Sequence, residues 1–197
     1  MSVKPLYQSP LLQQSVLILL VSLPLMRLIY LGIHDDLGAN PIEFITRSTG
    51  TWALVFLCAT LSITPLRQIT NQSFLLPWRR TLGLACFSYA LLHFLIWFWL
   101  DHGWSWSTMV FDVIERPFIT MGFLSFVMLL PLAITSNTWA MRSLGRQWKK
   151  LHRLIYVIAV TVILHYFWHK AGKQDFFEVS LYALLLGFLL LTRMVRR

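Results

Sequence analysis

Hydrophobic residues fall into six long runs along the chain, separated by short polar connections. A hydrocarbon core about 30 Å thick is spanned by a helix of about 20 apolar residues. The runs that approach this length are 11–31, 49–66, 81–100, 118–138, 151–168 and 176–192. The pattern predicts an all-α integral membrane protein, a six-transmembrane-helix bundle that forms one domain over residues 1–197. It shows no evident internal repeat.

Composition supports a membrane protein. Hydrophobic residues make up 57% of the 197 residues and charged residues 13%, with a mean hydropathy of +0.63. A soluble domain is nearer half apolar and a quarter charged. The connections are too short to hold a soluble catalytic domain, so we expect the function to be performed in the bilayer or through partners. Cys58 and Cys86 lie in apolar runs outside any CxxC pattern, and we assign them neither a disulfide nor a metal.

Basic residues alternate between the connections. The net charge of +9 therefore marks orientation in the membrane rather than nucleic-acid binding. The second and fourth connections and the C-terminus carry most of the basic residues: Arg67, Arg79, Arg80, Arg142, Arg146, Lys149, Lys150, Arg153, Arg193, Arg196 and Arg197. The other connections are acidic or mixed. By the positive-inside rule, both termini are predicted to be cytoplasmic and the acidic connections to face outward.

Two histidines occur inside predicted spans that run in the same direction. At about 1.5 Å per residue, His93 lies ~18 Å from Thr81, where its span starts, and His165 lies ~21 Å from Leu151. The two imidazoles are therefore predicted to meet at nearly one depth, as an axial pair for haem iron requires. The alternative is a pair of core histidines that are hydrogen-bonded to backbone or hydroxyl groups.

His152 is a third candidate, at the basic inner boundary. It precedes His165 by thirteen residues, which on a straight helix separates the two side chains by about 140°. It could ligate a second haem, contact a propionate or quinone, or be an interfacial histidine. The third span offers Arg79 and Arg80 at this depth instead of a histidine.

Arginines near these depths are candidates for cofactor contacts. Arg27 could pair with a haem propionate or snorkel to the headgroups. Arg79 and Arg80 could serve an inner cofactor in the same way, although orientation alone explains them. His169, one turn past His165, is a possible substitute ligand, but we expect it at the outer interface.

An ordered series of short motifs then indicates a family. The motifs are LGANPIEF (37–44), STG (48–50), ITPLR (63–67), RRTLGL (79–84), LLH (91–93), ERP (115–117), TS (135–136), SLGRQWKKLHRLIY (143–156) and His165. Together they resemble MsrQ, formerly YedZ, the family of haem-binding membrane subunits of the periplasmic methionine sulfoxide reductase system. The resemblance covers nearly the whole chain, from Gly32 to the last span.

The resemblance implies a six-helix protein of the bacterial inner membrane, related to the ferric-reductase and NADPH-oxidase transmembrane domain. Its family binds haem b and passes electrons from the quinone pool or a cytosolic flavin reductase. The recipient is MsrP, a periplasmic molybdopterin subunit that reduces methionine sulfoxide in proteins. The family's histidine ligands map onto His93, His152 and His165. FMN is also associated with the family, but no residue here can be assigned to it.

The chain departs from its wider superfamily at one position. Relatives carry two histidines on each of two helices, whereas Arg80 stands here where one of them is expected, so the number of haems is one or two. We therefore interpret the chain as an electron conduit. The alternatives are a histidine-based proton pathway or transporter, which would be colourless, and a simple membrane anchor for a partner.

Overall fold

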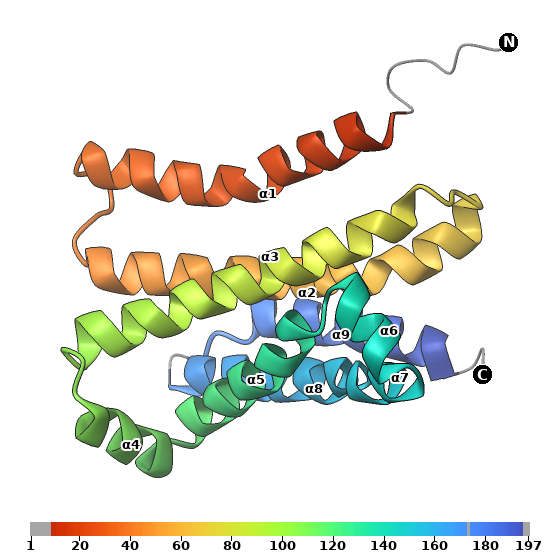
Figure 1. The fold of residues 1–197 in the computed structure, drawn as a ribbon. Helices are drawn as coiled ribbons and strands as arrows, with labels where there is room; N and C mark the ends of the chain where they lie inside the picture. Colours follow the sequence, from red (N-terminus) through yellow and green to blue (C-terminus); the bar gives the residue numbers. More distant parts are fainter. Residues whose placement is uncertain (1–8, 173, 195–197) are drawn as a thin grey trace, which may run out of the picture.

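The structure, a computed structural model, describes residues 9–172 and 174–194, and all the regular structure in this part of the chain is helical. The long helices are α1 (Pro10–Ile33), α2 (Pro41–Thr70), α3 (Leu75–Ile96), α5 (Pro117–Ile134), α8 (Leu154–Ala171) and α9 (Phe177–Met194) (Figure 1). The shorter elements are the π-helix η2 (Trp97–Asp101), α4 (Trp106–Glu115), α6 (Thr138–Leu144) and α7 (Arg146–Leu151).

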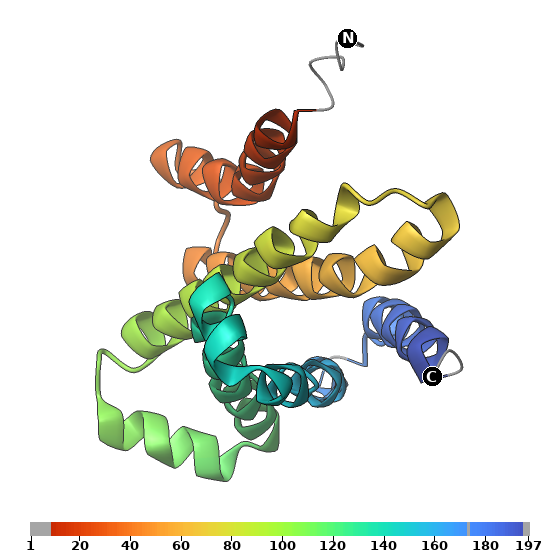
Figure 2. The same cartoon turned by 45° about the vertical axis from the view of Figure 1, so that its right-hand side comes forward.

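The long helices lie side by side between two ends of the molecule. Helix α2 packs chiefly against α3, and α5 chiefly against α8, whereas α9 contacts both α2 and α8. Helix α1 lies beyond the α2/α3 pair in both ribbon views (Figures 1 and 2). The core is therefore built from two helix pairs, with α1 and α9 added to them.

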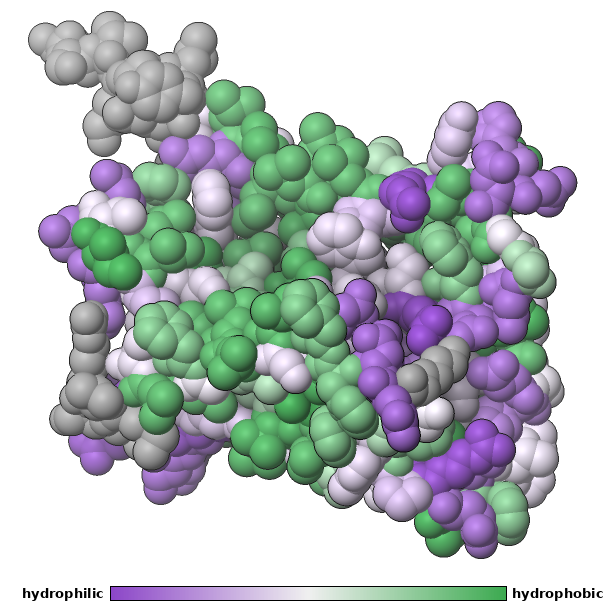
Figure 3. Space-filling model, turned by 180° about the vertical axis from the view of Figure 1, so that it is seen from behind, coloured by the Kyte–Doolittle hydropathy of each residue, from purple (hydrophilic) through white to green (hydrophobic). Residues whose placement is uncertain are grey.

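Five helical segments are long and apolar enough to cross a membrane. They are Leu11–Ile33, Pro41–Thr70, Leu75–Asp101, Pro117–Ile134 and Arg146–Ala171. In the space-filling view, hydrophobic residues fill the middle of the visible face and polar residues gather at its two ends (Figure 3). These features make the chain a multi-pass membrane protein. The sixth predicted span coincides with the 18-residue helix α9, but the described residues do not establish it as a span.

Several predicted boundaries are wrong, and local capping explains two of them. Helix α2 begins at Pro41 rather than residue 49, because the Asn40 side chain accepts the backbone N–H of Glu43 at 3.2 Å. The run 118–138 ends as α5 at Ile134, because Asn137 caps the separate helix α6 by accepting the N–H of Ala140 at 2.7 Å. The helices of the third and fifth predicted spans, α3 and α8, begin at Leu75 and Leu154 instead of residues 81 and 151.

A tyrosine attaches α1 to α3 at the proline inside α1. The Tyr89 hydroxyl accepts the N–H of Leu25 at 3.0 Å and donates to the carbonyl of Val21 at 2.9 Å. The hydroxyl thus stands between a backbone donor and acceptor four residues apart, next to Pro24. Gln14 on α1 and Thr81 on α3 form a second side-chain hydrogen bond. These bonds hold α1 against the pairs without bringing it to the histidines.

Candidate functional site

His93 and His165 lie in contact between α3 and α8. Their ring centroids are 6.3 Å apart and the ring planes are inclined at 76°. The prediction that the two imidazoles meet is confirmed. The depth counts behind it began at the wrong residues, since α3 starts earlier and α8 later than predicted.

Each imidazole is held through Nδ1 by a backbone carbonyl of the neighbouring helix. His93 Nδ1 lies 2.8 Å from the carbonyl oxygen of Thr46 on α2, and His165 Nδ1 lies 2.6 Å from that of Phe118 on α5. A carbonyl only accepts, so each Nδ1 carries the hydrogen, and in a neutral imidazole the Nε2 lone pair is then available. Metal-bound histidines commonly donate their other ring N–H in this way.

Two glycines let the imidazoles approach so closely. A Cβ at Gly50 would lie 3.0 Å from His93 Nδ1, and a Cβ at Gly122 would lie 2.7 Å from His165 Nδ1. Each glycine follows its bonded carbonyl residue by four positions in the helix. A larger residue would push the ring away from the carbonyl that holds it. Gly50 and Gly122 are therefore positioning residues that the sequence interpretation missed.

The two halves of the site have the same spacing of residues along the sequence. In both, 47 residues separate the histidine from the carbonyl residue that it contacts. Thr46, Gly50 and His93 in the first half correspond to Phe118, Gly122 and His165 in the second, each 72 positions later. The expectation of no internal repeat is wrong at this level. The shared glycine-to-histidine spacing is the signal that could have identified both glycines.

Two imidazoles alone can complete the coordination of a metal ion that is already held by a cofactor ring. Among the described residues no group of three or more His, Cys, Asp or Glu side chains could hold a metal ion. A haem iron has four ring nitrogens of its own and needs only two axial ligands. With metal–imidazole bonds of about 2 Å, imidazoles on opposite sides of one metal have ring centres about 6 Å apart. The observed 6.3 Å agrees with this value.

His152 does not lie on one straight helix with His165, as the predicted angle between the two side chains assumed. It lies at the C-terminal cap of α7 and before the start of α8, so the 140° separation expected on a straight helix does not apply. Its ring stacks on Trp148 at 3.9 Å, and its Nδ1 lies 3.1 Å from the Trp148 carbonyl oxygen. Its buried Nε2 has no hydrogen-bond partner among the described residues. A buried ring nitrogen is thus present at this level without a second histidine.

The other candidate residues lie outside the histidine pair. Arg27 is exposed on α1, and Arg80 is exposed near the start of α3, 72 positions before His152. The ring of His169 contacts that of Phe118, with centroids 5.7 Å apart. Within the described part of the chain, neither Arg27 nor Arg80 forms a hydrogen bond with His93 or His165.

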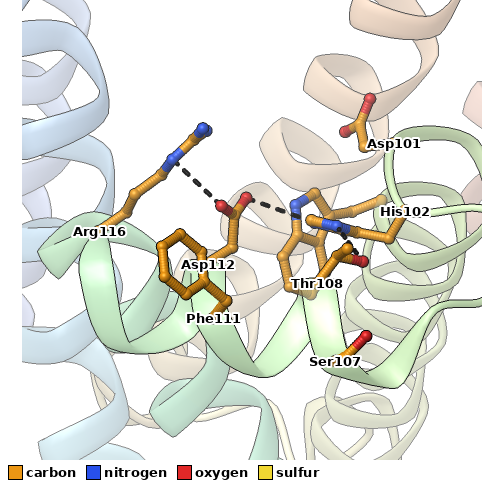
Figure 4. Close-up of a pocket in the computed structure, with 8 residues that line it drawn as sticks. Asp101, His102, Ser107, Thr108, Phe111, Asp112 and Arg116 are labelled. Carbon is orange, nitrogen blue, oxygen red and sulfur yellow. Dashed lines mark hydrogen bonds and ion pairs between the residues drawn. The ribbon is translucent and has the colours of Figure 1, made fainter.

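An open pocket of about 740 Å³ lies one turn beyond His93, where α3 gives way to η2 and α4. Trp97 and Phe111 line it, together with a short chain of charged groups (Figure 4). Asp112 lies 3.4 Å from His102 Nε2 and 3.4 Å from Arg116 Nε. The sequence interpretation gave His102 no role, and its place beside Asp112 depends on the turn between η2 and α4.

Comparison with known proteins agrees with this geometry. The family described as "Ferric reductase like transmembrane component" matches residues 49–163. A protein of Ralstonia nicotianae named "Protein-methionine-sulfoxide reductase heme-binding subunit MsrQ" is 56% identical over 173 residues, 87% of this chain and 80% of its own. Proteins of the same name from Bordetella pertussis and Herminiimonas arsenicoxydans are 53% and 51% identical, over 85% and 91% of this chain and 82% and 83% of theirs. No solved structure matches the chain.

The residues matched by the family include His93, Gly50 and Gly122. They end two positions before His165. The relatives extend the similarity over that histidine and most of the remaining chain. The chain therefore belongs to the ferric reductase-like transmembrane family and, within it, to the MsrQ subunits of the protein-methionine-sulfoxide reductase system.

Proposed function

We propose that the chain is an electron-transfer subunit of the bacterial inner membrane that binds haem b between His93 and His165. Electrons come from membrane quinol or a cytosolic flavin reductase. They pass outward to MsrP, a periplasmic molybdopterin subunit that reduces methionine sulfoxide in oxidised proteins. The observation that carries the proposal is the ring separation of 6.3 Å, with both Nδ1 atoms held and both Nε2 atoms available.

The distribution of charge supports an inside and an outside end. All eight acidic residues of the sequence fall in or beside the connections at one end: Asp35, Asp36, Glu43, Asp101, Asp112, Glu115, Asp175 and Glu178. The connections at the other end carry only basic charges. With six spans, α9 being the sixth, both termini are cytoplasmic by the positive-inside rule. The acidic end then faces the periplasm, where it attracts a partner with a basic docking surface.

The proposed role assigns distinct tasks to the residues of the chain. Haem, when bound, supplies one-electron chemistry that no side chain here provides. The carbonyls of Thr46 and Phe118 fix the tautomer and orientation of the two imidazoles and make them more basic ligands. The surrounding apolar helices keep water from the pair. Methionine sulfoxide itself reacts in the partner, so this chain needs no substrate pocket.

His152 is the residue from which a second haem site would be built. Its buried Nε2 is free, but the corresponding position in the first half is Arg80, which cannot serve as a neutral nitrogen ligand. We assign one haem to the histidine pair, and haem quantification per chain decides whether His152 adds another. We assign no residue to FMN.

The test is a reduced-minus-oxidised absorption spectrum of the purified chain, expressed with added haem, together with haem quantification. Sharp α and Soret bands of six-coordinate haem b are expected. The His152→Ala variant should retain the bands of the pair. A colourless protein would overturn the proposal in favour of the proton pathway. If His152→Ala alone removed all the haem, the assignment to His93 and His165 would be wrong.

A further inference from the structure

Two arginines from opposite ends of the sequence face one pocket at the basic end of the molecule. Arg79 lies in the first turns of α3, and Arg193 in the last turn of α9. The pocket has a volume of about 210 Å³ and is completed by Thr64, Pro65, Gln68, Tyr156 and Thr192. We call it the two-arginine pocket. It lies where the inner ends of α2, α3, α8 and α9 converge.

Arg193 is fixed in place by a proline. Pro65 has no N–H, so the carbonyl of Leu61, four residues earlier, lacks its usual helical donor. An Nη atom of Arg193 donates to this carbonyl at 2.8 Å, and the same nitrogen lies 3.4 Å from the Thr64 hydroxyl oxygen. The guanidinium also lies over the Tyr156 ring, 5.8 Å from its centroid. The arginine is thus held rigidly with donors to spare.

Among the described residues, no acidic side chain pairs with the positive charge of the pocket. Arg193 Nε is buried without a hydrogen-bond partner among the described residues. No ion pair within residues 9–172 and 174–194 involves Arg79 or Arg193. The sequence has no Asp or Glu from residue 44 to 100, from 116 to 174 or after 178. Two guanidiniums that line one pocket without a carboxylate form a favourable site for an anion from outside the chain.

We propose that the two-arginine pocket binds the phosphate group of an anionic membrane phospholipid. Guanidiniums match the planar, multi-oxygen geometry of phosphate, and basic pockets between transmembrane helices on the cytoplasmic side bind such headgroups. The volume of about 210 Å³ is below the ~300–1,000 Å³ of pockets that enclose whole drug-sized ligands. The pocket therefore suits a headgroup phosphate, with the acyl chains outside in the bilayer. The proposal does not depend on haem binding.

The bound lipid joins α3 and α9, two helices that make little direct contact with each other. Arg79 belongs to the first helix pair and Arg193 to the last helix, so one phosphate between them fastens α9 to the core. Snorkelling, the ordinary behaviour of an arginine near a helix end, leaves each side chain independent. The two explanations differ in whether removing one arginine releases a specific lipid.

The experiment measures phospholipid retained per chain, by mass spectrometry of extracts, after extensive washing in detergent. Wild type should keep about one phosphatidylglycerol or cardiolipin per chain. Arg79→Gln and Arg193→Gln should each weaken retention about tenfold or more, the loss expected for a charged hydrogen bond. Arg142→Gln, which removes an exposed arginine of α6 outside the pocket, is the matched control and should retain the lipid.

Arg79→Gln keeps the test decisive if Arg193→Gln unfolds, because Arg193 alone donates to the Leu61 carbonyl. If Arg79→Gln and Arg142→Gln lost equal amounts of phospholipid, retention would depend on general surface charge, and the proposal would be overturned. A thermal-stability gain from phosphatidylglycerol, but not from phosphatidylcholine or inorganic phosphate, supports it. The same gain from inorganic phosphate alone would identify a free-phosphate site and contradict it.

Discussion

The helix pairs α2/α3 and α5/α8 share one arrangement at the end that holds His93 and His165 and differ at the opposite, basic end. Each presents a histidine whose Nδ1 is held by a carbonyl 47 residues earlier, beside a glycine. At that basic end the first pair has the exposed Arg80 on a continuous helix. The second has His152 at the break between α7 and α8. The repeated part is the part that meets at the candidate metal site, which indicates that the site, rather than the packing, requires the repeat.

The pairs are also joined differently along their lengths. In the second pair, the hydroxyl oxygens of Ser125 and Thr161 are 2.7 Å apart and buried. The corresponding positions in the first pair, 72 residues earlier, are Ala53 and Tyr89, and Tyr89 bonds to α1 instead. The equivalent positions thus join α5 to α8 in the second pair and α3 to α1 in the first.

Removing either histidine should have the largest effect. His93→Ala and His165→Ala are each expected to abolish haem binding at the pair, because one axial ligand is lost and a cavity opens beside the other. The α-band of the purified variants measures this directly, with elution from a sizing column as the control for folding. Retention of the wild-type band in either variant would exclude that histidine as a ligand.

The glycines should come next and should reveal an asymmetry between the pairs. The Cβ of Gly122→Ala would lie 2.7 Å from His165 Nδ1, and that of Gly50→Ala 3.0 Å from His93 Nδ1. Loss of the supporting hydrogen bond lowers metal affinity by about 10–100-fold, and we expect Gly122→Ala near the upper value and Gly50→Ala near the lower. Haem titration of the apoprotein measures both.

Gly83→Ala is the matched control for the glycines. Its Cβ would meet only the Thr60 side chain, at an ordinary 3.7 Å. It should titrate with haem like wild type. If the three alanine variants bound haem equally well, the close approach of imidazole to backbone would have no part in the site.

Removing the hydrogen bond between Ser125 and Thr161 in the second pair should have a smaller effect, and on stability alone. Thr161→Val removes the bond to Ser125 and should lower the free energy of unfolding by about 0.6 kcal/mol, the average for side-chain hydrogen bonds in a membrane protein. A thermal unfolding midpoint about 1–3 °C lower is expected. The control is Thr70→Val, because the Thr70 hydroxyl bonds to the Leu66 carbonyl of its own helix.

The smallest effect concerns the connection between α8 and α9. Lys170 Nζ lies 2.6 Å from Asp175, and this hydrogen-bonded cation lowers the pKa of Asp175 below its ordinary value. A carboxylate with a lowered pKa stabilises the fold above its ordinary pKa, and the contribution disappears as the pH falls through the lowered value. Asp175→Asn should therefore lower the unfolding midpoint slightly at pH 7 and not in strong acid. Asp36 forms no ion pair among the described residues, so Asp36→Asn is the control and should leave the unfolding midpoint at pH 7 unchanged.

Hydrophobic runs predicted the helices well but not their ends. Run length reflects the hydrocarbon core, whereas helix ends reflect capping. Helix α2 begins where Asn40 caps it, before the run 49–66, and α6 begins where Asn137 caps it, within the run 118–138. Helix α4 was not predicted because its ten residues are too short for a span. Capping signals at Asn40–Pro41 could have extended the first of these predictions.

The candidate site was predictable in its ligands and not in its supports. A histidine inside an apolar run is a strong signal, because ionisable groups in a membrane are costly. Gly50 and Gly122 give no such signal by themselves, since glycine is common in transmembrane helices. The position of His152 required the break before α8, which hydrophobicity does not register.

The central claim is that each helix pair supplies one imidazole to the same iron. The electron paramagnetic resonance spectrum of the oxidised, haem-loaded His152→Ala variant tests it most directly, because only the pair can then ligate. We predict one low-spin signal of the highly anisotropic kind, since imidazole planes 76° apart leave two iron d orbitals nearly equal in energy. A high-spin signal, from an iron without two strong axial ligands, would contradict the account.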